Sequence, residues 1–103
     1  MNETTETIAQ QINARELAFN KFKIAFSDEE NYVSIRKGRK RIEIKYDGAG
    51  DLYVVTKQKF KRFFGDPNDI QEEVLDSVFF DQLKPIIETF FKFDYVLEKL
   101  RVV

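Results

Sequence analysis

The sequence predicts an α+β fold, a single domain over residues 1–103 with an N-terminal helix, a three- to four-stranded antiparallel meander and C-terminal helices packed on one face of the sheet. Near the C-terminus, large apolar residues recur at alternating spacings of four and three, which is typical of one helix face. The middle of the chain alternates apolar and polar residues, which is typical of half-buried strands. The helical stripe consists of Phe79, Leu83, Ile86, Phe90, Phe93, Leu97 and Leu100.

A first helix is predicted at residues 5–18, because apolar side chains recur there every three to four positions. Ile8, Ile12 and Phe19 form a narrow stripe, with Leu17 beside it. Thr4 or Thr5 is the expected N-cap, since a hydroxyl oxygen can accept a hydrogen bond from the first turn. We therefore expect this helix to pack on the sheet.

Four strands are predicted next, at residues 22–26, 32–36, 41–46 and 52–56. The sheet has only three strands if residues 22–26 continue the first helix or lie apart. Side chains alternate between the two faces along a strand. Val33 and Ile35 of the second strand therefore share a face with Ile42 and Ile44 of the third only if the connecting loop has an even number of residues. A loop of two residues, Lys37-Gly38, or of four, Lys37 to Lys40, satisfies this condition.

After the strands the chain alternates bases with Phe, and the segment 65–68 then breaks the pattern with a Gly and a Pro. A short acidic helix is predicted from Asp69 to about Asp76. The long last helix is expected to begin near Asp81, because Pro85 is tolerated only in a first turn. The other option is a kink between Phe80 and residue 84.

Composition excludes several classes of chemistry. The chain has no Cys and no His, so thiol nucleophiles, Cys-ligated zinc and a histidine general base are all ruled out. The acidic segments around 28–30 and 47–51 are interpreted as turns, because a calcium loop needs a denser set of oxygen ligands. We expect a non-enzymatic protein without a cofactor or metal. A polar, acidic start and the lack of a long apolar run predict a cytoplasmic location without a membrane partner.

Charge is distributed unevenly along the chain despite a formal net charge of −1. Twelve bases and six acids lie between Lys21 and Arg62, whereas both flanking segments are acidic. A basic hairpin tip can contact phosphates, and more bases follow the fourth strand. Tyr32 and Tyr53 are candidate stacking surfaces. The candidate nucleic-acid-binding residues are Arg36, Lys37, Arg39, Lys40, Arg41, Lys57, Lys59, Lys61 and Arg62.

Large apolar residues near the C-terminus exceed what one face of a small sheet requires, which indicates a surface for a protein partner or a second copy. The candidate interface residues are Phe79, Phe80, Phe90, Phe91, Phe93, Leu97 and Leu100. The favoured interpretation is an interaction protein acting through this surface, and the alternative is a nucleic-acid-binding module acting through the hairpin at 36–41. The alternative requires the bases at 36–41 and 57–62 to converge, whereas the favoured one requires an exposed apolar patch.

Several short segments lie in an order that supports a family resemblance. They are Thr7-Ile8-Ala9-Gln10-Gln11-Ile12, Ile44-Lys45-Tyr46, Asp51-Leu52-Tyr53-Val54-Val55 and Val78-Phe79-Phe80-Asp81-Gln82-Leu83. In these segments the chain resembles small proteins encoded by phages and mobile elements. The resemblance implies a helix, meander, helix layout and a mobile-element origin. It implies no activity, and the basic tip and the C-terminus beyond Phe93 depart from the pattern.

Overall fold

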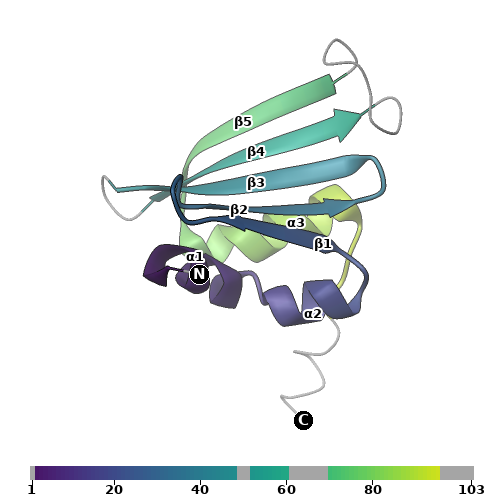
Figure 1. Ribbon diagram of the computed structural model, residues 1–103. Coiled ribbons are helices and arrows are strands. Elements are labelled where there is room, and N and C mark those ends of the chain that lie inside the picture. The colour runs from purple at the N-terminus through teal and green to yellow at the C-terminus, as the bar shows by residue number, and fades with distance from the viewer. Residues whose placement is uncertain (1, 49–51, 61–69, 96–103) are drawn as a thin grey trace.

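The computed structural model describes residues 2–48, 52–60 and 70–95, which fold into one sheet backed by helices (Figure 1). The helices are α1 (Glu3–Gln11), α2 (Ala14–Phe19), the 3₁₀ turn η2 (Phe80–Gln82) and α3 (Leu83–Phe91). The strands are β1 (Lys23–Ser27), β2 (Tyr32–Lys37), β3 (Lys40–Asp47), β4 (Leu52–Phe60) and β5 (Ile70–Val78).

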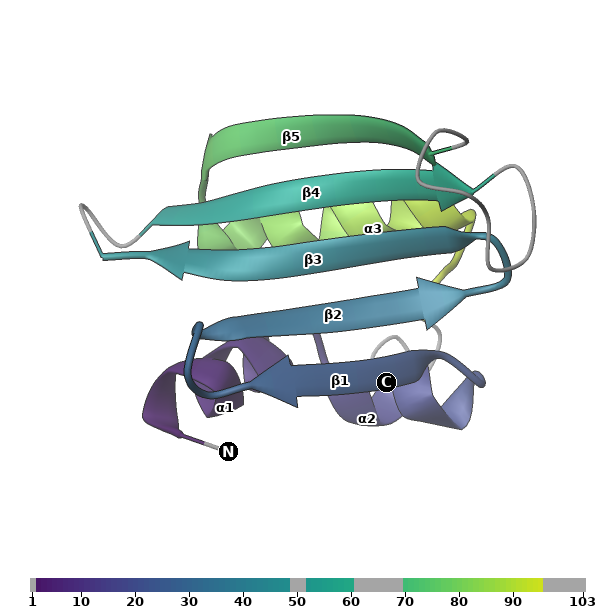
Figure 2. The same cartoon turned by 45° about the horizontal axis from the view of Figure 1, so that its top comes forward.

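The five strands form an antiparallel meander in the order β1-β2-β3-β4-β5. All three α-helices lie on the same side of the sheet, and in Figure 2 the opposite face is turned toward the viewer with no helix over it. The predicted α+β class and antiparallel sheet are confirmed. The predicted strand count is wrong, because the sheet has five strands, one of which is the segment at 23–27.

The fifth strand replaces the acidic helix predicted for residues 69–76. In the structure β4 continues to Phe60, which gives β5 a long edge to pair with. The acids of β5 then lie opposite polar and basic residues of β4. The Lys57 Nζ atom lies 2.6 Å from the Glu73 Oε1 atom, and the Gln58 side chain donates to Glu72 at 2.8 Å. Cross-strand pairing therefore overrides the local helical pattern.

The β2–β3 hairpin confirms the predicted even loop. Lys37 pairs with Lys40, which leaves Gly38 and Arg39 as a two-residue connection. The predicted four-residue loop pairs Arg36 with Arg41, and the structure has this register with one further pair, Lys37 with Lys40. Gly38 has a φ of +63°, a conformation that glycine adopts without a steric penalty at the first position of such a turn.

The predicted first helix is two helices, because Asn13 interrupts it in the left-handed region with a φ of 50°. The N-cap is also different from the one expected. Asn2, rather than Thr4 or Thr5, caps α1 with its side-chain oxygen, which accepts from the Thr5 N–H at 2.8 Å. The break lets α2 turn away from α1, so that Ile12 and Leu17 both reach the core.

The end of α2 is a Schellman motif in which a lysine occupies the position that glycine usually takes. The Lys21 N–H donates to the Ala18 oxygen and the Phe22 N–H donates to the Leu17 oxygen, both at 3.0 Å. Lys21 has a φ of +68°. A left-handed conformation costs a residue with a β-carbon about 1–2 kcal/mol.

We expect Lys21→Gly to raise the free energy of unfolding by about 0.5–1 kcal/mol, because the larger entropy of glycine in the unfolded chain offsets part of the gain. Urea denaturation of the purified protein measures this change. Lys21→Ala removes the same charge and keeps the β-carbon, so it should give no gain. Equal stabilisation by both variants would show that charge, not backbone strain, is responsible.

The core lies between the helices and the sheet. Its fully buried members come from every layer, and rings from the segment after α3 close its side. α3 ends at Phe91 because Lys92 adopts a left-handed conformation with a φ of 54°. The prediction that this helix continues to residue 100 is therefore wrong for residues 92–95, which are not helical. Leu97 and Leu100 lie outside the described residues. The buried core residues are Ile8, Ile12, Leu17, Phe22, Val33, Ile35, Ile42, Ile44, Tyr53, Val55, Val78, Leu83, Ile87 and Tyr95.

A carboxylate in the β1–β2 turn holds the start of α1. The Asp28 Oδ1 atom accepts from the Asn2 N–H and from the Thr5 hydroxyl, both at 2.8 Å. These two hydrogen bonds hold the pKa of Asp28 below its ordinary value of 3.8. Because the folded pKa is lowered, ionised Asp28 stabilises the fold above pH 3.8, and this contribution is lost as the pH falls through the folded pKa.

We expect Asp28→Ala to speed amide hydrogen exchange in the first turn of α1 at pH 6 and to make little difference at a pH below the folded pKa. Exchange measured by mass spectrometry on the intact chain checks this. Glu29→Ala, in the same turn, is the matched control and should leave α1 protected. A difference between wild type and Asp28→Ala that persists unchanged in acid would contradict the role of the ionised carboxylate.

No helix in the described part of the chain is long and apolar enough to cross a membrane.

Candidate functional site

The meander gathers most of the described bases at one end of the sheet, where Glu72 and Glu73 of β5 also lie beside Lys57. The β2–β3 turn, the end of β4 and the end of α3 lie at one end, while the β1–β2 turn and the start of α3 lie at the other (Figures 1 and 2). Acidic residues gather at the second end, among them Glu3, Asp28, Glu29, Glu30, Asp47 and Asp81. The first, which we call the basic end, contains Lys21, Lys23, Arg36, Lys37, Arg39, Lys40, Arg41, Lys57, Lys59 and Lys92.

On the helix-free face, the basic end carries a row of three directly paired bases. Lys23 pairs with Arg36, which in turn pairs with Arg41. The Arg36 guanidinium lies 5.6 Å from the centre of the Phe60 ring, and Arg41 contacts Glu43 at 2.6 Å. These contacts spread the long side chains over the sheet, so the row presents positive charge across three neighbouring strands.

On the helix side, a second group of bases surrounds the ring of Phe90 near the end of α3. The Nζ atoms of Lys40, Lys57 and Lys59 lie 5.5, 5.8 and 5.8 Å from the ring centre. Lys92, two residues after Phe90, is the C-cap of α3. The strands position this group, because Lys40 and Lys59 are paired across β3 and β4.

Lys40 is the most constrained of these bases. Its ammonium donates to the Phe90 carbonyl oxygen at 2.8 Å, one of the carbonyls that a helix end leaves without an intrahelical partner. Burial lowers the pKa of Lys40, and the positive charges of Lys59 and Lys92 lower it further. The cluster therefore disfavours its own protonated state, and a bound anion would relieve that repulsion.

Like charges that lie directly opposite each other destabilise an antiparallel sheet. Four such pairs occur at the basic end, namely Lys23 with Arg36, Arg36 with Arg41, Lys37 with Lys40, and Lys40 with Lys59. Within the described ranges, no carboxylate forms an ion pair with Lys40, Lys59 or Lys92. Folding thus concentrates positive charge that the described part of the chain only partly neutralises.

The structure brings most of the predicted nucleic-acid residues together at the basic end but divides them between the two faces of the sheet. Arg36 and Arg41 lie on the helix-free face, whereas Lys37 lies over the Phe22 ring on the helix side, 5.0 Å from its centre. Lys40, Lys57 and Lys59 join Lys37 on that side, and Arg39 forms the turn. The predicted Lys61 and Arg62 lie outside the described residues.

The two tyrosines suggested as stacking surfaces do not belong to this site. Tyr32 begins β2 at the acidic end. Tyr53 is buried, and its hydroxyl donates to the Gln11 side chain at 2.7 Å, so its prediction as a stacking surface is wrong. The aromatic side chains that do lie among the bases are those of Phe60 and Phe90.

The predicted apolar interface is also divided. Phe79 and Phe80 are 57% and 61% exposed, next to the start of α3 at the acidic end. Phe90, Phe91 and Phe93 are partly buried against the core instead. Phe22 explains this difference, because its ring makes edge contacts with Phe91 and Phe93 at 4.9 and 5.3 Å. Among the described residues of the predicted interface, the exposed rings are thus those of Phe79 and Phe80.

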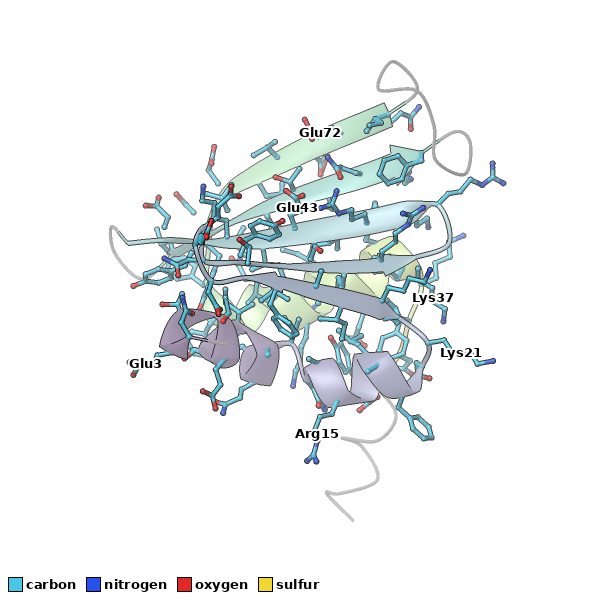
Figure 3. All side chains as sticks on the ribbon, in the orientation of Figure 1. Glu3, Arg15, Lys21, Lys37, Glu43 and Glu72 are labelled. Atoms are coloured by element: carbon cyan, nitrogen blue, oxygen red, sulfur yellow. The ribbon has the colours of Figure 1, made fainter. Side chains whose placement is uncertain are left out.

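The sequence interpretation missed three bases that the fold adds to the basic end, namely Lys21, Lys23 and Lys92. Lys92 is far from the hairpin in sequence, and only the antiparallel return of α3 along the sheet brings it near Lys40 (Figure 1). Figure 3 shows Lys21 and Lys37 directed to the same end of the molecule, with Glu3 at the opposite end. The signal available beforehand was the position of Lys21 and Lys23 at the start of a strand that pairs with the hairpin.

Comparison of the chain with protein-family models, curated proteins and solved structures gives no match in any of the three. The resemblance to phage and mobile-element proteins therefore stays a prediction.

Proposed function

We propose that the protein is a non-enzymatic nucleic-acid-binding module that contacts the phosphate backbone with the basic end of its sheet. The observation that carries this proposal is the convergence of ten described bases at one end, from segments as distant in sequence as Lys21 and Lys92. Bases that neutralise phosphates release counterions, which supplies affinity without reading sequence. Binding is therefore expected to be salt-dependent and largely independent of base sequence.

The hairpin is flanked by β1 and β4 almost to its tip, since Lys23 pairs with Arg36 and Lys59 pairs with Lys40. The whole end of the sheet, rather than a free two-stranded ribbon, would therefore lie against the phosphates. In that position the turn at Arg39 and the row that includes Arg36 and Arg41 would contact the backbone. The acidic end, which carries Asp28 and Asp47, would point away from the phosphates. The chain can thus bind a polyanion although its net charge is −1.

Fluorescence anisotropy with labelled random single- and double-stranded DNA and RNA, at low and moderate salt, tests this proposal. We expect binding at low salt that weakens steeply as salt is added. Absence of binding to all four at low salt would refute it. Binding that does not change with salt would also contradict a backbone-contacting mechanism.

A second candidate function is binding of a protein partner or a second copy through the exposed rings of Phe79 and Phe80. Their turn is closed by hydrogen bonds, because the Phe79 N–H donates to the Gln82 side chain at 2.9 Å and the Gln82 N–H donates to the Phe79 oxygen at 3.0 Å. Phe80 also lines a pocket of about 340 Å³ with Tyr46 and Tyr53. Two exposed aromatic rings on a hydrogen-bonded turn are suited to anchoring an interface.

We expect the paired substitution Phe79→Ser and Phe80→Ser to abolish any self-association seen by light scattering while the chain stays folded. The control is Phe26→Ser, which removes another exposed ring, on β1, and should leave association unchanged. A wild-type protein that stays monomeric at high concentration would exclude the second copy as the partner of Phe79 and Phe80. Association that survives the Phe79 and Phe80 substitutions would place the interface elsewhere.

A further inference from the structure

A groove of about 800 Å³ lies between α3 and the strands β4 and β5. In Figure 2, α3 runs behind the sheet at β3 and β4, and β5 lies beyond it at the edge. The volume falls within the range of about 300–1,000 Å³ that is usual for small-molecule sites. The groove shares Lys40, Lys59 and Lys92 with the basic end but lies apart from the turn at 38–39 and from the helix-free row of bases. A small ligand held in it therefore goes beyond the proposed contact with a phosphate backbone.

The two ends of the groove differ in charge and its middle is apolar. Lys40, Lys59 and Lys92 line one end, and Asp76 and Asp81 line the other. The apolar lining between them comes from Leu75, Val78, Pro85, Ile86 and Phe90. An elongated ligand with one charged group therefore has a single favourable orientation in the groove.

We propose that this groove binds a small amphipathic anion, whose carboxylate or phosphate lies among Lys40, Lys59 and Lys92 and whose apolar body lies against Ile86 and Phe90. The ligand class follows from charge complementarity at the lysine end and from the apolar lining next to it. Asp76 and Asp81 repel an anion, so its headgroup is directed away from them.

The lysines of the groove are arranged to gain from such a ligand. Lys40 already gives one hydrogen bond to the Phe90 oxygen, and an ammonium has three donors, so two stay available. Burial lowers the pKa of Lys40, and the charges of Lys59 and Lys92 lower it further. One anionic group would offset the repulsion among the three lysines.

The test is a titration of the ¹⁵N-labelled full chain with three probes that share one apolar body: 2-naphthoate, 2-naphthyl phosphate and neutral 2-naphthamide. We expect the two anions to shift the amide resonances of α3 and β5 at concentrations up to about 5 mM, and the amide to bind at least ten-fold more weakly. The carboxylate and phosphate probes together show which headgroup the lysines prefer.

Three variants locate the site. The paired change Lys59→Gln and Lys92→Gln should weaken naphthoate about ten-fold, the cost of losing charged hydrogen bonds. Thr89→Trp places a large ring in the groove from an exposed helix position and should abolish binding while the chain stays folded. Lys45→Gln removes an exposed base on the other face of the sheet and should change nothing.

The proposal is overturned by equal binding of naphthoate and naphthamide, by shifts confined to residues outside the groove, or by no shifts at the highest concentration. The paired change Arg36→Gln and Arg41→Gln separates it from the proposed function, because that change should weaken nucleic-acid binding and leave naphthoate binding intact. Loss of one activity with retention of the other therefore shows which of the two proposals has failed.

Discussion

Ile44→Ala is expected to lower the free energy of unfolding by about 3–4 kcal/mol. Ile44 is fully buried on the helix side of β3, where it pairs with Val33 and Val55 in the neighbouring strands. Removing its three outer carbons leaves a cavity that the central strands cannot close. For a domain of this size, each kcal/mol corresponds to about 4–8 °C, so we expect the melting temperature to fall by about 12–32 °C.

Thermal and urea denaturation followed by circular dichroism measure this loss. Lys45→Ala is the matched control, because it is the next residue of the same strand, is exposed and points to the other face of the sheet. It should change the stability by less than about 0.5 kcal/mol. If Ile44→Ala costs less than about 1 kcal/mol, the side chain is not in the core and the register of β3 is wrong.

Neutralising the hairpin is expected to weaken nucleic-acid binding roughly 100-fold at low salt. The variant carries Arg36→Gln, Arg39→Gln and Arg41→Gln, and each substitution removes about 1 kcal/mol of charge-assisted contact with a phosphate. The slope of log affinity against log salt should also become shallower by about 2–3, since each phosphate contact contributes about 0.9. Fluorescence anisotropy at several salt concentrations gives both quantities.

The matched control removes the same number of positive charges away from the basic end. It carries Arg15→Gln, Lys45→Gln and Lys84→Gln, and Figure 3 shows Arg15 on α2, away from the hairpin. If binding depends on the basic end, this control should retain affinity within about three-fold, or about 0.7 kcal/mol. Equal losses in both variants would mean that the net charge of the chain, and not the geometry of the hairpin, controls binding.

Local patterns in the sequence are sufficient to predict the central part of the fold. Alternation over 32–36 and 41–46 gives the two inner strands and the parity of their loop, because a one-residue slip would move every apolar side chain to solvent. Pro85 likewise predicts where α3 begins, because a proline fits only a first turn. The charge asymmetry of the chain also predicts a basic region, although not all of its members.

The errors occur where contacts between distant segments decide the structure. The acidic segment at 70–78 was expected to begin with a helix, but it pairs with β4 as a strand, and the Lys57–Glu73 ion pair supports that pairing. The apolar stripe past Phe91 is equally ambiguous. Phe93 packs against the core, as its position in the apolar stripe predicts, but it does so from a non-helical segment. In the same segment the Tyr95 hydroxyl donates to the Ile12 oxygen at 2.7 Å. The spacing of apolar residues along the sequence does not predict such contacts between distant segments.

The candidate site was predictable in its residues but not in its geometry. The run at 36–41 predicts that bases gather at a turn, whereas their division between two faces follows from strand alternation around the two-residue loop. The addition of Lys92 depends on where α3 ends. The groove between α3 and β5 could not be predicted at all, because β5 itself was expected to be a helix.

The most direct test of the central claim is a titration of the ¹⁵N-labelled chain with a short random DNA duplex at low salt, followed by amide chemical shifts. We expect the largest shifts at residues 36–41 and at the end of β4, with the acidic turn at 28–31 unchanged. Shifts centred on Phe79 and Phe80, or on the acidic end, would contradict the assignment of the basic end as the binding surface. So would a spectrum that does not change when duplex is in excess.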